Sequence, residues 1–413
     1  MNDLEKLESI LESLGGEKRI RYTLDHFKSA LKSVGNPEQT VKSFLIGGTN
    51  GKGTTTLLIS HALKASGLKV STYLSPHLQS PTERILNQLE PISEKTLLEL
   101  AIEFKHTAKQ FELTYFEFLT LLFFVHANRT QSDYSVIEVG LGGRLDSTNV
   151  FDPVASILTN VSLDHQAFLG DTKEAILNEK LGILRPSGLL FTGINEPELK
   201  KIVATKCQEL RATSYFSEKV TSKSLKSIWD GQETVIDGFS FFLTNPSPGT
   251  LVNAKLAYLT LRTLFPSIPI STLQTAFQNT KTPGRFETVN LNPRVVLSGD
   301  HNLAGIECLK ETLKNSKSGR LLTLCGFSPD KPFAEMYGEL KAISDEILLT
   351  QIPRLKDKTT QSYRRLGPFE EDATKAVQKM LALARPEDTV LVTGSLYLVG
   401  ELRKLWKDKV SFQ

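Results

Sequence analysis

One segment of the chain has the residue types that bind phosphate: Gly47-Gly48-Thr49-Asn50-Gly51-Lys52-Gly53-Thr54-Thr55-Thr56. It follows an apolar run and opens a helical pattern. Glycines let backbone N–H groups approach phosphate oxygens, and a helix N-terminus adds partial positive charge. Lys52 would supply a full charge, and the hydroxyl of Thr54 could reach Mg²⁺. The Walker A spacing is not met, because Gly53 separates the lysine from Thr54. The alternative is a glycine-rich turn between a strand and a helix.

Other charged residues stand beside apolar patterns. Glu138 lies near the end of a predicted strand, Tyr134–Val139, and α/β proteins bind ligands where such strands end. Because Mg²⁺ prefers oxygen ligands, Glu138 is the strongest carboxylate candidate for a metal. The alternative is an exposed glutamate at a strand end. From the local sequence alone, we interpret His165 as a hydrogen-bonded structural histidine and Lys180 as a residue on a solvated helix face.

Strand and helix patterns alternate along the chain, which predicts an α/β fold with a mostly parallel sheet. The predicted helices are Leu4–Leu14, Gly53–Ala65, Thr114–Ala127 and Leu251–Leu264. The predicted strands are Ser43–Ile46, Lys69–Tyr73, Tyr134–Val139, Val154–Thr159, Leu189–Thr192, Arg294–Leu297, Leu321–Cys325, Glu346–Thr350 and Thr389–Thr393. Residues 213–250 are rich in Ser, Thr and Lys, and Glu233–Leu243 predicts an antiparallel hairpin. The Pro-Gly break in Lys281–Arg285 predicts the start of a second, smaller α/β domain.

Length and composition narrow the class of protein. The 413 residues suggest two or three domains, and a net charge of +3 argues against a nucleic-acid binder. Three scattered cysteines fit a reducing cytosol. The longest apolar stretch, Phe116–Ala127, is too short to span a bilayer, and the N-terminal residues lack a secretory pattern. We therefore expect a soluble, cytoplasmic protein without a nucleic-acid or membrane partner.

The loop variant GTNGKG-T resembles that of the Mur-ligase superfamily of ATP-dependent amide ligases, and most closely the folylpolyglutamate synthase/dihydrofolate synthase family. Further motifs of that family run from about residue 35 to 397: Gly35-Asn36-Pro37, Ser75-Pro76-His77-Leu78 with Glu83-Arg84, Glu138–Asn149 (EVGLGGRLDSTN), Asp164-His165, Glu179-Lys180 with Gly182-Ile183, Thr282-Pro283-Gly284-Arg285 and Gly394-Ser395-Leu396-Tyr397. The resemblance implies a P-loop ATPase-like domain over 1–284, a smaller Rossmann-like ligase domain over 285–413, and a monomer.

The resemblance also implies the chemistry. ATP phosphorylates a carboxylate, and the amine of L-glutamate attacks the resulting acyl phosphate. Cations must hold the charge of the transferring phosphoryl group, and the family uses Mg²⁺ at two sites.

The residue roles that the resemblance implies fall into four groups. The nucleotide is bound by Gly48, Thr49, Asn50, Gly51, Lys52, Gly53, Thr54, Asn253, Arg285, Asp300 and His301. Mg²⁺ is bound by Thr54, Ser75, Glu138 and His165. The catalytic residues are Lys52, His165, Lys180 and Arg285, with Lys180 carbamylated by CO₂ into an anion that binds the second Mg²⁺. The pteridine substrate is bound by Pro76, His77, Phe116 and Asp146. For Arg285 the alternative is a surface linker arginine, and for Asp146 it is the cap of the turn before Thr148.

The chain departs from the family pattern at four places. Gly249-Thr250 stand where the family has His-Gln. Ser298 replaces an aspartate, so that Asp300 lies two residues later; Pro332 replaces the second aspartate of a DKD motif; and Pro81 replaces an aromatic residue. These changes affect the predicted surroundings of adenine, ribose and pterin, and leave the phosphate and Mg²⁺ residues intact.

Asp146 suggests the substrate, because a carboxylate can accept paired hydrogen bonds from a pterin. We expect a ligase that adds L-glutamate to dihydropteroate, to reduced folates, or to both. The alternatives are folylpolyglutamate synthesis only, a cell-wall Mur ligase, a P-loop switch NTPase, and a non-catalytic folate- or nucleotide-binding relative. GTNGKG and SPHL disfavour the cell-wall ligase.

Overall fold

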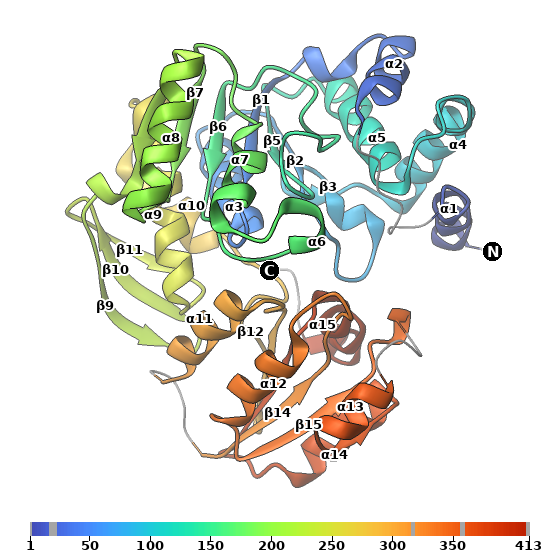
Figure 1. The fold of residues 1–413 in the computed structure, drawn as a ribbon, viewed down its shortest axis with the longest axis vertical. Helices are drawn as coiled ribbons and strands as arrows, with labels where there is room; N and C mark the ends of the chain where they lie inside the picture. Colours follow the sequence, from blue (N-terminus) through green and yellow to red (C-terminus); the bar gives the residue numbers. More distant parts are fainter. Residues whose placement is uncertain (1, 16–22, 315–318, 356–359, 410–413) are drawn as a thin grey trace. The chain divides into compact units, whose positions relative to one another are not determined.

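The computed structural model describes residues 2–15, 23–314, 319–355 and 360–409. The chain divides into two compact units (Figure 1). The first comprises Met1–Val161, Leu169–Val220 and Asn253–Ala276, and the second comprises Ser162–Phe168, Thr221–Val252 and Phe277–Gln413. The predicted two-domain α/β fold with mostly parallel sheets is confirmed.

The first unit is built on an eight-stranded sheet with the order β4-β3-β2-β5-β1-β6-β7-β8. Its strands are β1 (Lys42–Gly47), β2 (Val70–Tyr73), β3 (Ile85–Asn87), β4 (Glu90–Pro91), β5 (Tyr134–Glu138), β6 (Ala155–Leu158), β7 (Leu189–Thr192) and β8 (Thr213–Phe216). All neighbours pair in parallel except β2–β3 and β3–β4. The central strands are buried, which is why they read as continuous apolar runs.

Helices connect and cover these strands. They are α1 (Asp3–Glu12), α2 (Asp25–Ser33), α3 (Lys52–Ala65), α4 (Glu94–Gln110), α5 (Tyr115–Arg129), α7 (Lys173–Leu181) and α8 (Pro197–Leu210). The helix α3 packs on β1, β2 and β5, and α4 packs on α1 and α5. A capping box, in which Thr114 and Glu117 each bond the other's backbone N–H, starts α5, and most of its side chains are buried, as predicted for Thr114–Ala127. Three further helices have residues assigned to both units: α6 (Gln166–Leu169), α9 (Pro248–Leu264) and α10 (Ile270–Asn279).

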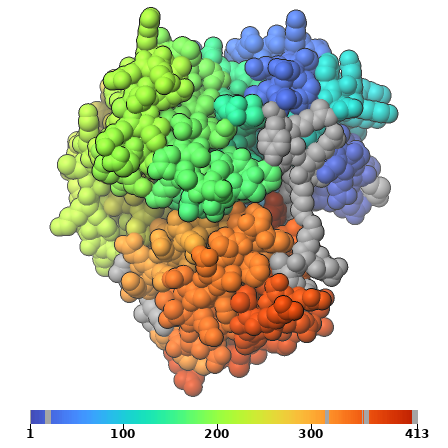
Figure 2. Space-filling model, viewed as in Figure 1, coloured from blue at the N-terminus to red at the C-terminus, as the bar shows by residue number. Residues whose placement is uncertain are grey.

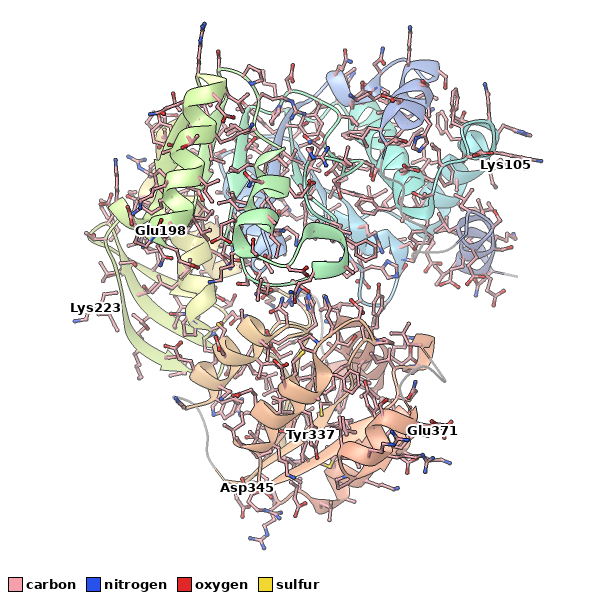
Figure 3. All side chains as sticks on the ribbon, in the orientation of Figure 1. Lys105, Glu198, Lys223, Tyr337, Asp345 and Glu371 are labelled. Atoms are coloured by element: carbon pink, nitrogen blue, oxygen red, sulfur yellow. The ribbon has the colours of Figure 1, made fainter. Side chains whose placement is uncertain are left out.

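The second unit contains a three-stranded antiparallel sheet in the order β11-β10-β9. The predicted hairpin is formed by β10 (Gly231–Ile236) and β11 (Phe239–Leu243). The third strand, β9 (Ser222–Ile228), has no apolar periodicity because nearly all its residues are exposed. It belongs to the yellow-green surface in Figure 2, and Figure 3 shows its Lys223 extending away from the sheet.

A six-stranded sheet, β12-β13-β17-β14-β15-β16, forms the rest of the second unit. Its strands are β12 (Glu287–Leu291), β13 (Arg294–Ser298), β14 (Leu321–Cys325), β15 (Glu346–Thr350), β16 (Phe369–Glu370) and β17 (Thr389–Thr393), and only β12 is antiparallel to its neighbour. The helices are α11 (Leu303–Lys314), α12 (Phe333–Lys341), α13 (Thr360–Leu366), α14 (Ala373–Leu383) and α15 (Leu396–Arg403). In the described residues, no helix is long and apolar enough to cross a membrane.

A buried ion pair ties α15 to β12. Arg403 bonds both carboxylate oxygens of Glu287, at 2.8–3.2 Å, and the two side chains are 7% and 14% exposed. Glu287 also accepts a bond from the backbone N–H of Gly284, at 2.8 Å. The pair therefore anchors the linker that carries Arg285.

We predict that Arg403→Ala destabilises the second unit by about 3–5 kcal/mol, because it leaves the Glu287 carboxylate buried without its partner. Both tryptophans of the chain, Trp229 and Trp406, belong to this unit, so tryptophan fluorescence during urea unfolding measures its stability. The neighbouring Lys404 pairs with Glu401 on the surface, and Lys404→Ala should cost less than about 1 kcal/mol. Equal effects of the two substitutions would contradict the prediction.

Candidate active site

The predicted phosphate loop joins β1 to α3, and two of its glycines occupy positions closed to other residues. Gly48 has φ +143°, and a Cβ there would lie 1.8 Å from Oγ1 of Thr159. Gly51 has φ +82°, and its Cβ would lie 2.3 Å from Oδ1 of Asn253. Positive φ and close approach both require glycine at these two positions.

Two residues that the sequence analysis missed hold this loop. Asn160 accepts from the backbone N–H of Thr49 through its carbonyl, at 3.0 Å, and from that of Asn50 through Oδ1, at 2.9 Å. Thr159 Oγ1 donates to the carbonyl of Asn50, at 2.7 Å. The available signal was their position directly after β6, which pairs with β1, because parallel strands end at the same edge of a sheet.

Two lysines bond carbonyl groups of the loop. Nζ of Lys52, at the start of α3, donates to the carbonyl of Thr49 at 3.2 Å. Nζ of Lys180, on α7, donates to the carbonyl of Gly48 at 2.9 Å. Lys180 is only 3% exposed, so the solvated helix face suggested by its local sequence is wrong.

Glu138 is buried at the end of β5 and meets the start of α3. Its Oε2 accepts from the backbone N–H of Ser75 at 2.9 Å, and a Cβ on Gly53 would lie 3.3 Å from the same oxygen. The alternative of an exposed strand-end glutamate is therefore wrong, because Glu138 is 6% exposed. Thr54 follows Gly53 on α3. Glu138, Ser75 and Thr54 thus belong to neighbouring segments around the loop.

The donor set around Glu138 suits Mg²⁺. The described residues contain no group of three or more His, Cys, Asp or Glu side chains that could hold a metal ion. A cation at Glu138 would therefore draw its other ligands from hydroxyl, phosphate and water oxygens. That is how Mg²⁺ is usually bound beside a nucleotide.

The predicted substrate residues form a second cluster in the first unit. Arg84 links His77, whose Nδ1 accepts from its Nε at 2.9 Å, to Phe116, whose ring centroid is 6.0 Å from its guanidinium carbon. Phe116 packs over Gly140, whose added Cβ would lie 2.5 Å from Phe116 and 3.1 Å from Asp146. Pro76 precedes His77 directly and follows a cis Ser75–Pro76 peptide bond.

Within this cluster, Asp146 caps its own turn. Oδ1 accepts from the backbone N–H and the hydroxyl of Thr148, at 2.9 and 2.5 Å, and Oδ2 accepts from the backbone N–H of Leu141 at 2.8 Å. Burial raises the pKa of Asp146, and these hydrogen bonds oppose that rise. The capping role that the sequence analysis left as an alternative is therefore present.

His165 lies at the edge of a buried polar cluster in the second unit. Asp164 accepts from Nζ of Lys331 at 2.5 Å and from the side-chain amide of Asn302 at 2.9 Å, and Nε2 of His165 lies 3.4 Å from Nζ of Lys331. Burial alone raises the pKa of Asp164, but the charges of Lys331, His165 and His301 hold it well below its usual range. His165 itself is 36% exposed on the side chain and has φ +51°.

Arg285, Asp300 and His301 lie around one backbone carbonyl. Nη1 of Arg285 donates to the carbonyl of Gly299 at 3.1 Å, and Nδ1 of His301 lies 3.0 Å from the same oxygen. Asp300 accepts from Ser298 Oγ at 2.6 Å, and burial raises its pKa. Burial and the charge of Arg285 lower the pKa of His301 to about 4. The fourth nucleotide candidate outside the loop, Asn253, lies against Gly51 in the first unit.

Comparison with known protein families gives the class of protein to which the chain belongs. Residues 46–250 match the Mur ligase middle domain, and residues 284–396 match the Mur ligase glutamate ligase domain. The chain is 32% identical to the folylpolyglutamate synthase of Lacticaseibacillus casei, over 94% of this chain and 95% of that protein. It is also 32% identical to the dihydrofolate synthase/folylpolyglutamate synthase of Escherichia coli, over 88% and 86%. The chain belongs to the folylpolyglutamate synthase/dihydrofolate synthase family of Mur ligases.

Solved structures agree with this assignment. The apo form of the L. casei folylpolyglutamate synthase (FPGS) superimposes with a TM-score of 0.85 at 28% identity, covering 98% of this chain and 99% of that one. A complex of FPGS with AMPPCP and folate gives 0.87 at 29% identity, with the same coverage. The predicted family and ligase class are confirmed, and the P-loop switch is excluded as a description of the whole chain.

We predict that Gly48→Ala lowers the affinity for a non-hydrolysable ATP analogue by at least about tenfold, because the new Cβ collides with Thr159 and the positive φ adds about 1–3 kcal/mol of strain. Titration calorimetry measures the affinity. Gly67→Ala is the matched control, because Gly67 has φ +90° but no atom within 4 Å of an added Cβ. Affinity lost equally in both variants, or in neither, would refute the role given to this contact.

Proposed function

We propose that this chain is an ATP-dependent ligase that adds L-glutamate to a pteridine-linked carboxylate, either dihydropteroate or a reduced folate, through an acyl phosphate. The observation that carries the proposal is the loop in which Lys52, Lys180 and Glu138 meet. A phosphoryl group transferred there would be surrounded by backbone N–H groups, the cation of Lys52 and a carboxylate able to hold Mg²⁺, with Lys180, whose carbamylation is proposed below, on α7 beside the loop. Relatives that carry both activity names, and an FPGS complex with folate, support the substrate class.

The proposed steps of the ligase reaction follow from the charges and positions of these residues. Bound Mg²⁺ supplies charge neutralisation on the phosphates. Glu138, Ser75 and Thr54 would hold one Mg²⁺, and His165 a second. Lys52 would bind the phosphates, while Asn253, Arg285, Asp300 and His301 remain predicted nucleotide ligands. After the carboxylate attacks the terminal phosphorus of ATP and ADP leaves, the glutamate amine attacks the acyl carbon. A tetrahedral intermediate then expels phosphate. We keep 1–284 and 285–413 as the proposed ATP-binding and ligase domains, and a cytoplasmic monomer as the proposed form.

The direct test is phosphate release with ATP, Mg²⁺ and L-glutamate, comparing 7,8-dihydropteroate with tetrahydrofolate and identifying the products by mass. We expect a glutamate-dependent product with at least one substrate. Product from neither would refute the ligase proposal and favour the non-catalytic relative.

A second candidate is folylpolyglutamate synthesis only. It is favoured by Asp146, whose carboxylate already accepts three hydrogen bonds within its own turn. These bonds leave less acceptor capacity for a pterin. Product from tetrahydrofolate alone would establish this candidate, and product from dihydropteroate would exclude it.

Carbamylation of Lys180 belongs to the same proposal. The neutral amine would attack CO₂ and release a proton, which converts a buried cation beside the Gly48 carbonyl into an anion able to bind Mg²⁺. We predict a carbamate signal in ¹³C NMR of the protein with ¹³C-bicarbonate, absent in Lys180→Arg, whose guanidinium stays protonated. The exposed Lys173 on α7 provides a control, since Lys173→Arg should keep the signal. No signal in the wild type would exclude the modification.

A further inference from the structure

The linker that carries Arg285, residues 282–287, is bonded by the three-stranded sheet. Asn245 lies two residues after β11, and its Nδ2 donates to the carbonyl of Arg285 at 2.7 Å and to Oγ1 of Thr282 at 3.3 Å. Its Oδ1 accepts from the backbone N–H of Ser247 at 2.9 Å. An N–H group can bond only the oxygen of the amide, so this contact turns the NH₂ group of Asn245 toward the linker. The bonds are protected from water, because Asn245 is 8% exposed.

A tryptophan in the turn between β9 and β10 covers the next residue of the linker. The ring of Trp229 stacks on that of Phe286, with centroids 5.9 Å apart and planes inclined by 18°. The guanidinium carbon of Arg294, on β13, lies 4.7 Å from the centroid of the Trp229 ring. Phe286 is 6% exposed and has φ +51°, which costs free energy in a residue with a side chain. The stack therefore helps to hold Phe286 in a conformation that is unfavourable by itself.

The end of β13 supplies further bonds to the same segment. Oγ of Ser298 accepts from the backbone N–H of Phe286 at 3.1 Å, and Ser298 is 3% exposed. The backbone N–H of Gly299 donates to the carbonyl of Gly284 at 2.8 Å. The residues directly before and after Arg285 are therefore both bonded, in addition to its own carbonyl.

The side chain of Arg285, by contrast, keeps most of its donors. Within the described part of the chain, its guanidinium donates one hydrogen bond, from Nη1 to the carbonyl of Gly299 at 3.1 Å, and forms no ion pair. A guanidinium has five N–H donors, and anions such as carboxylate and phosphate accept them in pairs. A cation on a backbone that is already held loses little conformational entropy when it binds an anion.

We propose that Asn245 and Trp229 are positioning residues, through which the three-stranded sheet holds the linker so that Arg285 can bind an anion. That this anion is a phosphate group of the nucleotide rests on the proposed function. The sheet, which carries none of the phosphate or Mg²⁺ motifs, then contributes to nucleotide binding through Arg285. The Pro-Gly break in the linker belongs to a bonded segment of the second unit.

Hydrogen exchange followed by mass spectrometry tests the support of the linker without any ligand. Asn245→Leu removes both bonds to the linker, and we expect the amide protons of Arg285 and Phe286 to exchange about tenfold faster than in the wild type. Asn290→Leu is the matched control, because Nδ2 of Asn290 also donates to a backbone carbonyl at 2.7 Å, that of Pro293 between β12 and β13. Unchanged exchange in Asn245→Leu, or equally fast exchange of the linker in the control, would overturn the inference.

The same measurement tests the aromatic stack. Trp229→Leu should also speed the exchange of the Phe286 amide proton, because no ring then covers Phe286. Trp229→Phe keeps an aromatic ring at this position and should restore most of the protection. Equal exchange in the two variants would refute the role given to the stack.

Titration calorimetry with a non-hydrolysable ATP analogue tests the link to the anion. We expect Arg285→Ala to weaken binding about tenfold or more, in keeping with the loss of hydrogen bonds from a charged group. Asn245→Leu should weaken it by a smaller factor, because it leaves the guanidinium in place but less well held. In the double variant, Asn245→Leu should add nothing to the loss caused by Arg285→Ala. Additive losses would show that Asn245 acts independently of Arg285 and would refute the positioning role.

These outcomes separate the inference from the proposed function. If Arg285→Ala binds the ATP analogue as tightly as the wild type, while the wild type forms a glutamate-dependent product, the proposed function stands and the nucleotide is not the anion of Arg285. If no product forms but the exchange and calorimetry results are as expected, the ligase proposal fails and the positioning role stands.

Discussion

The site depends on the attachment of the phosphate loop to the residues that follow β6. Without a side chain, Gly48 lets the loop backbone approach Thr159, and Asn160 then bonds Thr49 and Asn50. The loop is therefore held in shape by protein groups before any nucleotide binds. This is the preorganisation that electrostatic stabilisation requires, since donors already in place need no reorganisation during phosphoryl transfer.

Strand register brings the remaining charges to this loop. In the parallel sheet, Ile46 of β1 pairs with Glu138 of β5 on one side and with Ile157 of β6 on the other. The carboxylate and the loop anchors therefore come to the same edge as the glycines. Lys180 lies on α7, and its ammonium is buried against the backbone carbonyl of Gly48 in the loop. A change of register in either pair would separate groups that we propose act on one phosphoryl group.

Sequence patterns predicted the elements whose signal lies within their own residues. The buried strands and the apolar helix α5 have periodicities set by their own burial, and the loop motif carries its own glycine requirement.

The strand β9 was missed because its exposed Ser and Lys residues give no alternation. Thr159 and Asn160 were missed because their role is a contact across about 110 positions of sequence. The local reading of Lys180 failed for the same reason: a helix pattern does not reveal which charged residue a distant loop will bury. Asp146 shows the opposite case, because its nearest partner, Thr148, lies two residues away and the turn was predictable.

The central claim is that the site activates a carboxylate by phosphorylating it. The most direct measurement uses a substrate whose carboxylate carries ¹⁸O, with ATP, Mg²⁺ and L-glutamate, and mass analysis of the phosphate released. An acyl phosphate predicts one ¹⁸O atom in each phosphate formed, because the attacking carboxylate oxygen leaves with the phosphoryl group when the amide forms. Phosphate without label, with both ¹⁸O atoms kept by the substrate, would show that ATP is hydrolysed apart from the carboxylate and would contradict the account.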